Sequence, residues 1–194
     1  IDFGIYPYTS SSSTIASYAP IGAGIPGQKL DNTIGIMKAY STCVGEGPFT
    51  CEMFGEKAEA LRKAGGEYGA ATGRPRRVGP FDIVASKYGV RIQGADVLAL
   101  TKLDVLSYMD KIPVVTAYDI DGKITGDFPT GGELDKAKPV IEYIEGWKCD
   151  IGKCRKESDL PKTAYNYIKY IEKKVGCNVK YVSEIGRASC RERV

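Results

Sequence analysis

An apolar run at Asp96–Thr101 constrains the fold of this 194-residue chain more than any other feature. Such a run is typical of a strand that is buried on both faces, as in a parallel sheet covered by helices. We expect further strands at Thr33–Tyr40 and Ile112–Tyr118. The second of these is followed by Asp121 and Gly122, which predict a hairpin turn into another short strand.

Helical patterns separate the expected strands. The clearest is Leu160–Val175, which carries apolar residues along one side and stops at Gly176. Two shorter helices are expected at Glu56–Ala64 and Phe81–Gly89, and the first of them should stop at Gly65 and Gly66. The serine- and glycine-rich segment Tyr6–Gly27 predicts a long surface loop. Because strands alternate with helices, the sequence predicts the α/β class, with a mixed, largely parallel sheet flanked by helices.

Composition excludes some classes of partner. The net charge of +3 is too small to argue for nucleic acid, and acidic residues are interleaved with the basic ones over Lys136–Lys174. No apolar run reaches the roughly 20 residues that cross a bilayer. The six cysteines form no Cys-x-x-Cys pair and there is no histidine, so we expect free thiols in a reducing cytoplasm and no metal site. Neither nucleic acid nor membrane is an expected partner.

The segment Ala70–Arg77 carries the strongest chemical signal. It holds three arginines, one threonine, Gly73 and Pro75. Guanidinium groups are always charged, and their forked donors match the oxygens of carboxylates and phosphates in pairs. The segment therefore predicts a shaped loop that clamps a small polyanionic ligand. A solvated basic turn is the alternative that the pattern leaves open.

A second signal, Thr101–Asp104, directly follows the apolar strand. In open α/β sheets, ligands lie beyond the carboxyl ends of strands. The carboxylate of Asp104 could accept from the N1–H and 2-amino groups of guanine, and the stem of Lys102 could cover the purine face. The alternative is an exposed strand end with Asp104 as the N-cap of a helix.

Taken in order along the chain, these motifs resemble those of the adenylosuccinate synthetase family. The resemblance rests on Tyr6–Tyr8, Val44–Phe49, Gly69–Arg77 and Thr101–Asp104, covers Ile1–Ser183, and corresponds to the C-terminal portion of a single domain. It implies part of a GTP-dependent, Mg²⁺-requiring ligase of purine biosynthesis. That enzyme joins L-aspartate to IMP through a 6-phosphoryl-IMP intermediate, and it is a cytoplasmic homodimer.

The resemblance also assigns binding roles. It implies that aspartate and IMP contact Ser10, Val44, Ala70, Ala71, Thr72, Gly73, Arg74, Pro75 and Arg76. It implies that GTP contacts Arg76, Lys102, Leu103, Asp104 and Ser183. Three positions depart from the family pattern, since Ala71 and Ser10 stand where threonines are usual and Cys43 where an arginine is usual.

The family's catalytic machinery is not found in this sequence. Its glycine-rich phosphate loop, catalytic aspartate, catalytic histidine and Mg²⁺ ligands lie upstream of the matched portion, so we expect no catalytic residue here and no activity from this chain alone. Residues 184–194 resemble a sequencing adapter translated in frame, and we expect them to be non-native. A guanine-nucleotide switch and an anion- or nucleic-acid-binding module are the alternative functions.

Overall fold

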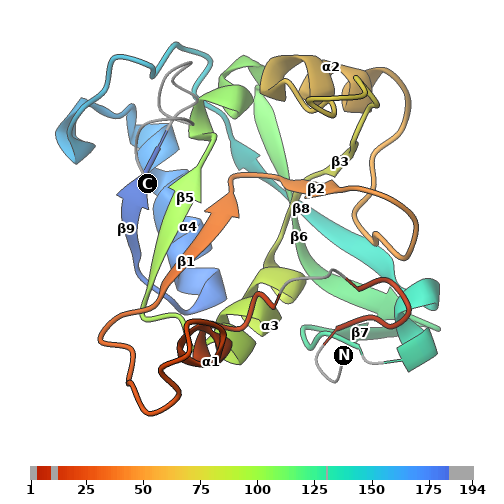
Figure 1. Ribbon diagram of the computed structural model, residues 1–194. Coiled ribbons are helices and arrows are strands. Elements are labelled where there is room, and N and C mark those ends of the chain that lie inside the picture. Colours follow the sequence, from red (N-terminus) through yellow and green to blue (C-terminus); the bar gives the residue numbers. More distant parts are fainter. Residues whose placement is uncertain (1–3, 10–12, 130, 184–194) are drawn as a thin grey trace.

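A parallel sheet of three strands forms one half of the molecule. The computed structural model describes residues 4–9, 13–129 and 131–183 (Figure 1). Strands β1 (Ile34–Lys38), β5 (Val97–Thr101) and β9 (Val179–Val182) lie in the order β1-β5-β9. Helix α4 (Lys162–Val175) packs behind them and contributes to the same core as β5. The expected α/β class is thereby confirmed.

The central strand β5 is buried less evenly than its sequence predicts. Leu98 and Leu100 are completely buried and face the core that α4 shares, but Val97 and Ala99 are only half-buried. The residue that pairs with Ala99 on the neighbouring strand, Ile36, is 76% exposed. The expectation of burial on both faces is therefore wrong, because within the described residues close packing reaches only the leucine face.

A second sheet is built around the long strand β6 (Lys111–Ile120). Strand β4 (Phe81–Asp82) pairs with it in parallel, and β7 (Lys123–Thr125) and β8 (Lys138–Glu145) pair with it antiparallel. The expected turn at residues 121–122 is confirmed, and both of its residues have positive φ. Strand β8 was not expected, because its apolar residues come in adjacent pairs and do not alternate with polar ones.

Two of the longer helices end where the sequence predicts, and a third begins later than predicted. Helix α2 (Gly55–Gly65) ends at Gly66, which has a φ of 61°, and α4 ends at Gly176 in the same conformation. Helix α3 (Ile83–Gln93) starts later than predicted. Phe81 belongs to β4, and Asp82 is the N-cap whose side chain accepts from the backbone N–H of Ala85.

The smaller elements connect these layers. Strands β2 (Ser41–Cys43) and β3 (Arg77–Gly79) form an antiparallel pair. The segment predicted as a long loop contains a 3₁₀ turn, η1, and a short helix, α1. The 3₁₀ turns and this helix are η1 (Ala16–Tyr18), α1 (Ala19–Gly22), η2 (Leu103–Tyr108), η3 (Gly131–Lys136) and η4 (Glu157–Asp159). None of the helices in the described ranges is long and apolar enough to span a membrane.

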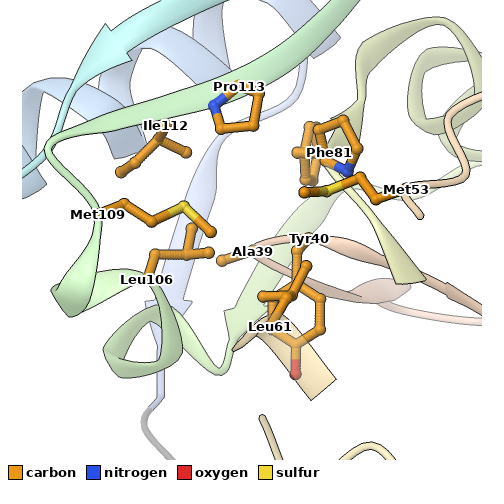
Figure 2. Close-up of a pocket in the computed structure, with 10 residues that line it drawn as sticks. Ala39, Tyr40, Met53, Leu61, Phe81, Leu106, Met109, Ile112 and Pro113 are labelled. Carbon is orange, nitrogen blue, oxygen red and sulfur yellow. The ribbon is translucent and has the colours of Figure 1, made fainter. Parts of the chain in front are cut away.

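A small pocket lies where α2, η2, β4 and β6 meet (Figure 2). Its lining is apolar and includes Leu61, Leu106 and Ile112, which also belong to the core. Tyr40 lies on the wall, but its hydroxyl donates to Glu67. The pocket is therefore a packing gap in the core. The hydroxyl of Tyr40 points away from it, toward Glu67 in the candidate site.

Candidate anion-binding site

The carboxyl ends of two parallel strands bring a pair of lysines to one edge of the first sheet. Strands β1 and β5 are in register, with Lys38 opposite Thr101, so Lys38 and Lys102 lie close together. Lys102 starts η2 in the left-handed conformation, with a φ of 59°. That conformation is uncommon for a residue other than glycine, and non-glycine residues that adopt it tend to cluster at functional sites.

Both lysines point at one buried carboxylate, Glu67, whose side chain has an exposed fraction of 0%. Its Oε1 accepts from the Nζ of Lys102 at 2.6 Å, the Nζ of Lys38 at 3.0 Å and the hydroxyl of Tyr40 at 2.5 Å. Its Oε2 accepts from Nη1 of Arg76 at 3.0 Å and from the Nζ of Lys38 at 3.1 Å. Three positive side chains therefore converge on one negative one.

This environment keeps Glu67 ionised. Burial raises its pKa, but the hydrogen bonds from Lys102, Tyr40 and Lys38 outweigh burial and lower the pKa to about 2. Burial also lowers the pKa of Lys38, although the bond to Glu67 opposes that change. Because three cationic side chains surround this one carboxylate, the cluster suits an anionic ligand.

Two glycines position Glu67. Gly66 ends α2 in the left-handed conformation, and Glu67 follows it with its backbone N–H donating to the carbonyl of Arg62. A Cβ on Gly65 would lie 2.3 Å from the hydroxyl of Tyr40, so only glycine permits this approach. Glu67 was not among the residues predicted from the sequence. The available signal was its place between a Gly-Gly helix stop and the arginine loop.

The arginine loop is an ordered, exposed turn. The N–H of Gly69 donates to the carbonyl of Arg74, and the N–H of Gly73 donates back to the carbonyl of Gly69, both at 2.8 Å. Gly73 has a φ of 64°, which explains the glycine in the motif. All residues from Ala70 to Pro75, including Ala71 and Thr72, are exposed. The predicted shaped loop is present, with Arg74 at its accessible end.

The two following arginines point to different partners. Arg76 donates to Glu67, and its Nε is the one buried side-chain nitrogen or oxygen in the described part of the chain that has no hydrogen-bond partner. Arg77 instead forms two hydrogen bonds to Glu52 and donates from Nη1 to the carbonyls of Gly45 and Gly47. Arg77 thus holds a loop within the protein. Of the three arginines in the motif, Arg74 and Arg76 remain candidates for binding an anion.

The loop that Arg77 fixes is Val44–Phe49. The guanidinium of Arg77 lies 5.4 Å from the ring centre of Phe49. Val44 lies at the exposed start of this loop and is 76% exposed. The loop and the arginine turn are joined at their bases because Cys43 pairs with Arg77 in the β2–β3 ladder. Ser10, the remaining residue predicted to contact IMP, lies outside the described residues.

The residues of the predicted guanine motif also lie together. Leu103 is completely buried, so it adds no exposed atom to this surface, and Asp104 is half-buried in the first turn of η2. The N–H of Ser183 donates to the carbonyl of Leu100, and the N–H of Leu103 donates to the carbonyl of Ser183. The N-cap of η2 is Lys102, which differs from the alternative of a cap at Asp104.

The described residues offer no metal centre. They contain no cluster of three or more cysteine, aspartate or glutamate side chains that could hold an ion. The cysteines among them are free thiols, at Cys43, Cys51, Cys149, Cys154 and Cys177.

Comparison with known proteins adds independent information. The family model for adenylosuccinate synthetase matches residues 1–189, a range that extends into the segment 184–194 expected to be non-native. The chain is 47% identical over 184 residues to the adenylosuccinate synthetase of Caldanaerobacter subterraneus subsp. tengcongensis, which covers 94% of this chain and 43% of that protein. It is 43% identical to the Bifidobacterium adolescentis protein of the same name, over 100% of this chain and 45% of the relative.

A solved structure is similar as well. A fully ligated adenylosuccinate synthetase from Plasmodium falciparum matches with a TM-score of 0.87 and 38% identity, over 93% of this chain and 44% of that one. The chain thus spans less than half of the length of the curated and solved relatives that it matches here.

Proposed function

The chain belongs to the adenylosuccinate synthetase family, and we propose that it forms the part of a GTP-dependent ligase that binds L-aspartate and the guanine nucleotide. The proposed reaction joins aspartate to IMP to give adenylosuccinate in AMP biosynthesis. One observation carries the proposal: Arg76 of the arginine loop and Lys102 of the guanine motif meet at Glu67, and a buried donor on Arg76 is left without a partner.

The arginine loop is proposed to bind aspartate and approach IMP. Its exposed end offers the hydroxyl of Thr72, the guanidinium of Arg74 and the backbone of Ala70–Pro75. Val44 is proposed to contact the same substrate through its backbone. Aspartate carries two carboxylates, and two forked donors at the base and tip of one turn would both neutralise and orient them. Loss of either fork should therefore weaken aspartate binding and slow the reaction.

The guanine base is proposed to bind at Lys102–Asp104 and Ser183. Asp104 supplies acceptor oxygens for the donor pair of guanine, which adenine lacks. Arg76, between this motif and the arginine loop, is proposed to reach the phosphates of GTP. The surplus positive charge around Glu67 supports this assignment, because charge that develops on a transferring phosphoryl group is stabilised by fixed cations.

Acid–base chemistry is proposed to come from the rest of the enzyme. The sequence contains no histidine, and the chain spans about 43% of its Caldanaerobacter relative. We therefore expect this polypeptide alone to form no adenylosuccinate. Mg²⁺ has no fitting ligand set among the described residues, and its ligands are proposed to lie in the rest of the enzyme. A cytoplasmic homodimer is the proposed working form of the complete enzyme.

A chimera tests the function. Residues 1–183 of this chain would replace the matching region of the Caldanaerobacter synthetase, and adenylosuccinate would be measured spectrophotometrically from IMP, aspartate and GTP. We expect activity from the chimera and none from the isolated chain. Arg74→Ala should lower kcat/KM for aspartate by about a hundredfold. The matched control is Lys123→Ala on the exposed strand β7, which should change nothing. A folded chimera without activity would overturn the proposal.

A further inference from the structure

We propose that Glu67 is a positioning residue that couples the arginine loop to the guanine motif, so that the bound amino acid and the bound nucleotide depend on one buried side chain. The inference rests on the proposed function and adds a residue to it. Glu67 touches neither proposed ligand surface directly, since its side chain is completely buried and each of its oxygens is already taken by protein donors.

The two motifs share one acceptor group, the carboxylate of Glu67. Lys102 and Arg76 come from the two different motifs, and each donates to a different oxygen of the same carboxylate. Lys38 donates to both oxygens and so links the two sides. Long side chains like these lose rotamer freedom on binding, and holding them in place beforehand removes that cost. A single carboxylate thus preorganises both cations.

Main-chain hydrogen bonds also connect residues 65–67 to both motifs. The N–H of Arg76 donates to the carbonyl of Glu67 at 3.0 Å, so the base of the arginine loop is hydrogen-bonded to the same residue that receives its guanidinium. On the other side, Lys102 donates to the carbonyl of Gly65 as well as to Glu67. Residues 65–67 therefore contact both motifs through main-chain and side-chain groups.

The cations around Glu67 outnumber its single negative charge. Three cations contact one carboxylate, although one cation is enough to satisfy a buried acid. Their side chains are 25%, 35% and 20% exposed for Lys38, Arg76 and Lys102, so each remains partly open to a ligand. Glu67 orients these cations without neutralising them. A residue that orients cations and leaves their charge in excess can support an anion site without touching the anion.

The variant Glu67→Gln separates charge from shape. Glutamine keeps the length and one acceptor oxygen but replaces the other oxygen with a donor group, which would face cations. In the chimera described above we expect KM for aspartate and KM for GTP both to rise about tenfold, with a smaller change in kcat. Glu67→Asp restores the charge on a shorter side chain and should recover part of both losses.

Asp82→Asn is the matched control, because Asp82 is also a buried carboxylate but lies in the second sheet, away from both motifs. It should leave both KM values unchanged. A rise in only one of the two KM values for Glu67→Gln would contradict the coupling. So would an equal response to the Asp82 control.

A second measurement keeps the inference separate from the proposed function. In the 194-residue chain without ligand, amide hydrogen exchange would be compared between the parent and Glu67→Gln. We expect faster exchange at Gly69, Arg76 and Leu103 and unchanged exchange in α4. If the parent chimera were inactive, the proposed function would be rejected. The exchange measurement would still test whether Glu67 couples the two motifs. The coupling would be overturned if exchange became faster at only one of the two motifs. It would also be overturned if exchange in α4 became faster to the same extent.

Discussion

Glu67 and Asp82 both carry buried carboxylates, and the two residues are 0% and 5% exposed. The groups that surround them differ in charge. Glu67 receives hydrogen bonds from three cations and a tyrosine, and its pKa is lowered to about 2. The described hydrogen bonds to Asp82 come from neutral groups, the hydroxyl of Tyr118 at 2.6 Å and the N–H of Ala85 at 3.0 Å. Burial raises the pKa of Asp82, and these bonds oppose it only in part.

The contrast shows that burial alone does not identify a functional carboxylate. Asp82 caps α3 and accepts from Tyr118, a member of a small core cluster, and neutral donors are sufficient for that structural role. Glu67 lies at the carboxyl edge of the parallel strands and is surrounded by more positive charge than it can neutralise. An excess of cations around a buried acid therefore points to a site for a further anion.

The largest expected effect on stability comes from removing the charge of Glu67. In Glu67→Gln the cations lose their shared partner, and breaking a buried ion pair costs about 3–5 kcal/mol. Because the cations are partly exposed and screened by solvent, we expect a value near the lower end, about 3 kcal/mol in the free energy of unfolding. Urea denaturation followed by circular dichroism would measure it. A loss no larger than that of Asp82→Asn would erase the distinction between the two sites.

A smaller loss is expected when the approach to Glu67 is obstructed. Gly65→Ala would place a methyl group 2.3 Å from the hydroxyl of Tyr40 and displace the Tyr40–Glu67 hydrogen bond. Overpacking of this kind costs about 1–3 kcal/mol. The control is Gly89→Ala within α3, where the added Cβ meets nothing within 4 Å. That control should be neutral or stabilising in thermal unfolding, and equal losses in both variants would refute the steric argument.

Asp82→Asn should have a modest effect. Asparagine caps helices about as well as aspartate, and with its oxygen on the N–H of Ala85 its amide nitrogen can donate to the hydroxyl oxygen of Tyr118, so we expect a loss of about 1 kcal/mol or less. The same urea experiment measures this loss. A destabilisation comparable to that of Glu67→Gln would mean that the charge of Asp82 matters as much, despite the neutral donors around it.

The two sites should also respond to pH with opposite sign. The pKa of Glu67 is lowered from its ordinary 4.5 to about 2, so its contribution is complete above pH 4.5 and is lost as pH falls toward 2. The pKa of Asp82 is raised from 3.8, so the native state holds its proton more tightly and stability falls as pH rises from 3.8 through that higher pKa.

Denaturation across pH 2–7 in the two variants separates these contributions. Glu67→Gln should flatten the rise in stability with pH below 4.5, and Asp82→Asn should remove the fall above 3.8. Identical pH profiles in the parent and both variants would show that neither carboxylate titrates in the way its surroundings indicate.

Local signals made much of the fold predictable. Helix stops at Gly66 and Gly176 and the hairpin at residues 121–122 follow from backbone preferences of neighbouring residues, and all of them are confirmed. The start of α3 was misplaced because Phe81 fits a helical pattern as well as it fits a strand. Its pairing with Val114, far along the chain, decided between the two.

For the candidate site, the sequence by itself determined the two motifs, because the chemistry of arginine forks and of an aspartate after a buried strand is carried by adjacent residues. Only the tertiary structure decided which arginine serves which partner. It directs Arg76 toward Glu67 and Arg77 toward Glu52, although the two are neighbours in the chain. Glu67 itself gathers donors that lie 29, 27, 9 and 35 residues away, at Lys38, Tyr40, Arg76 and Lys102. Electrostatic partners over such separations are set by the pairing of strands and the packing of helices, and no local pattern encodes them.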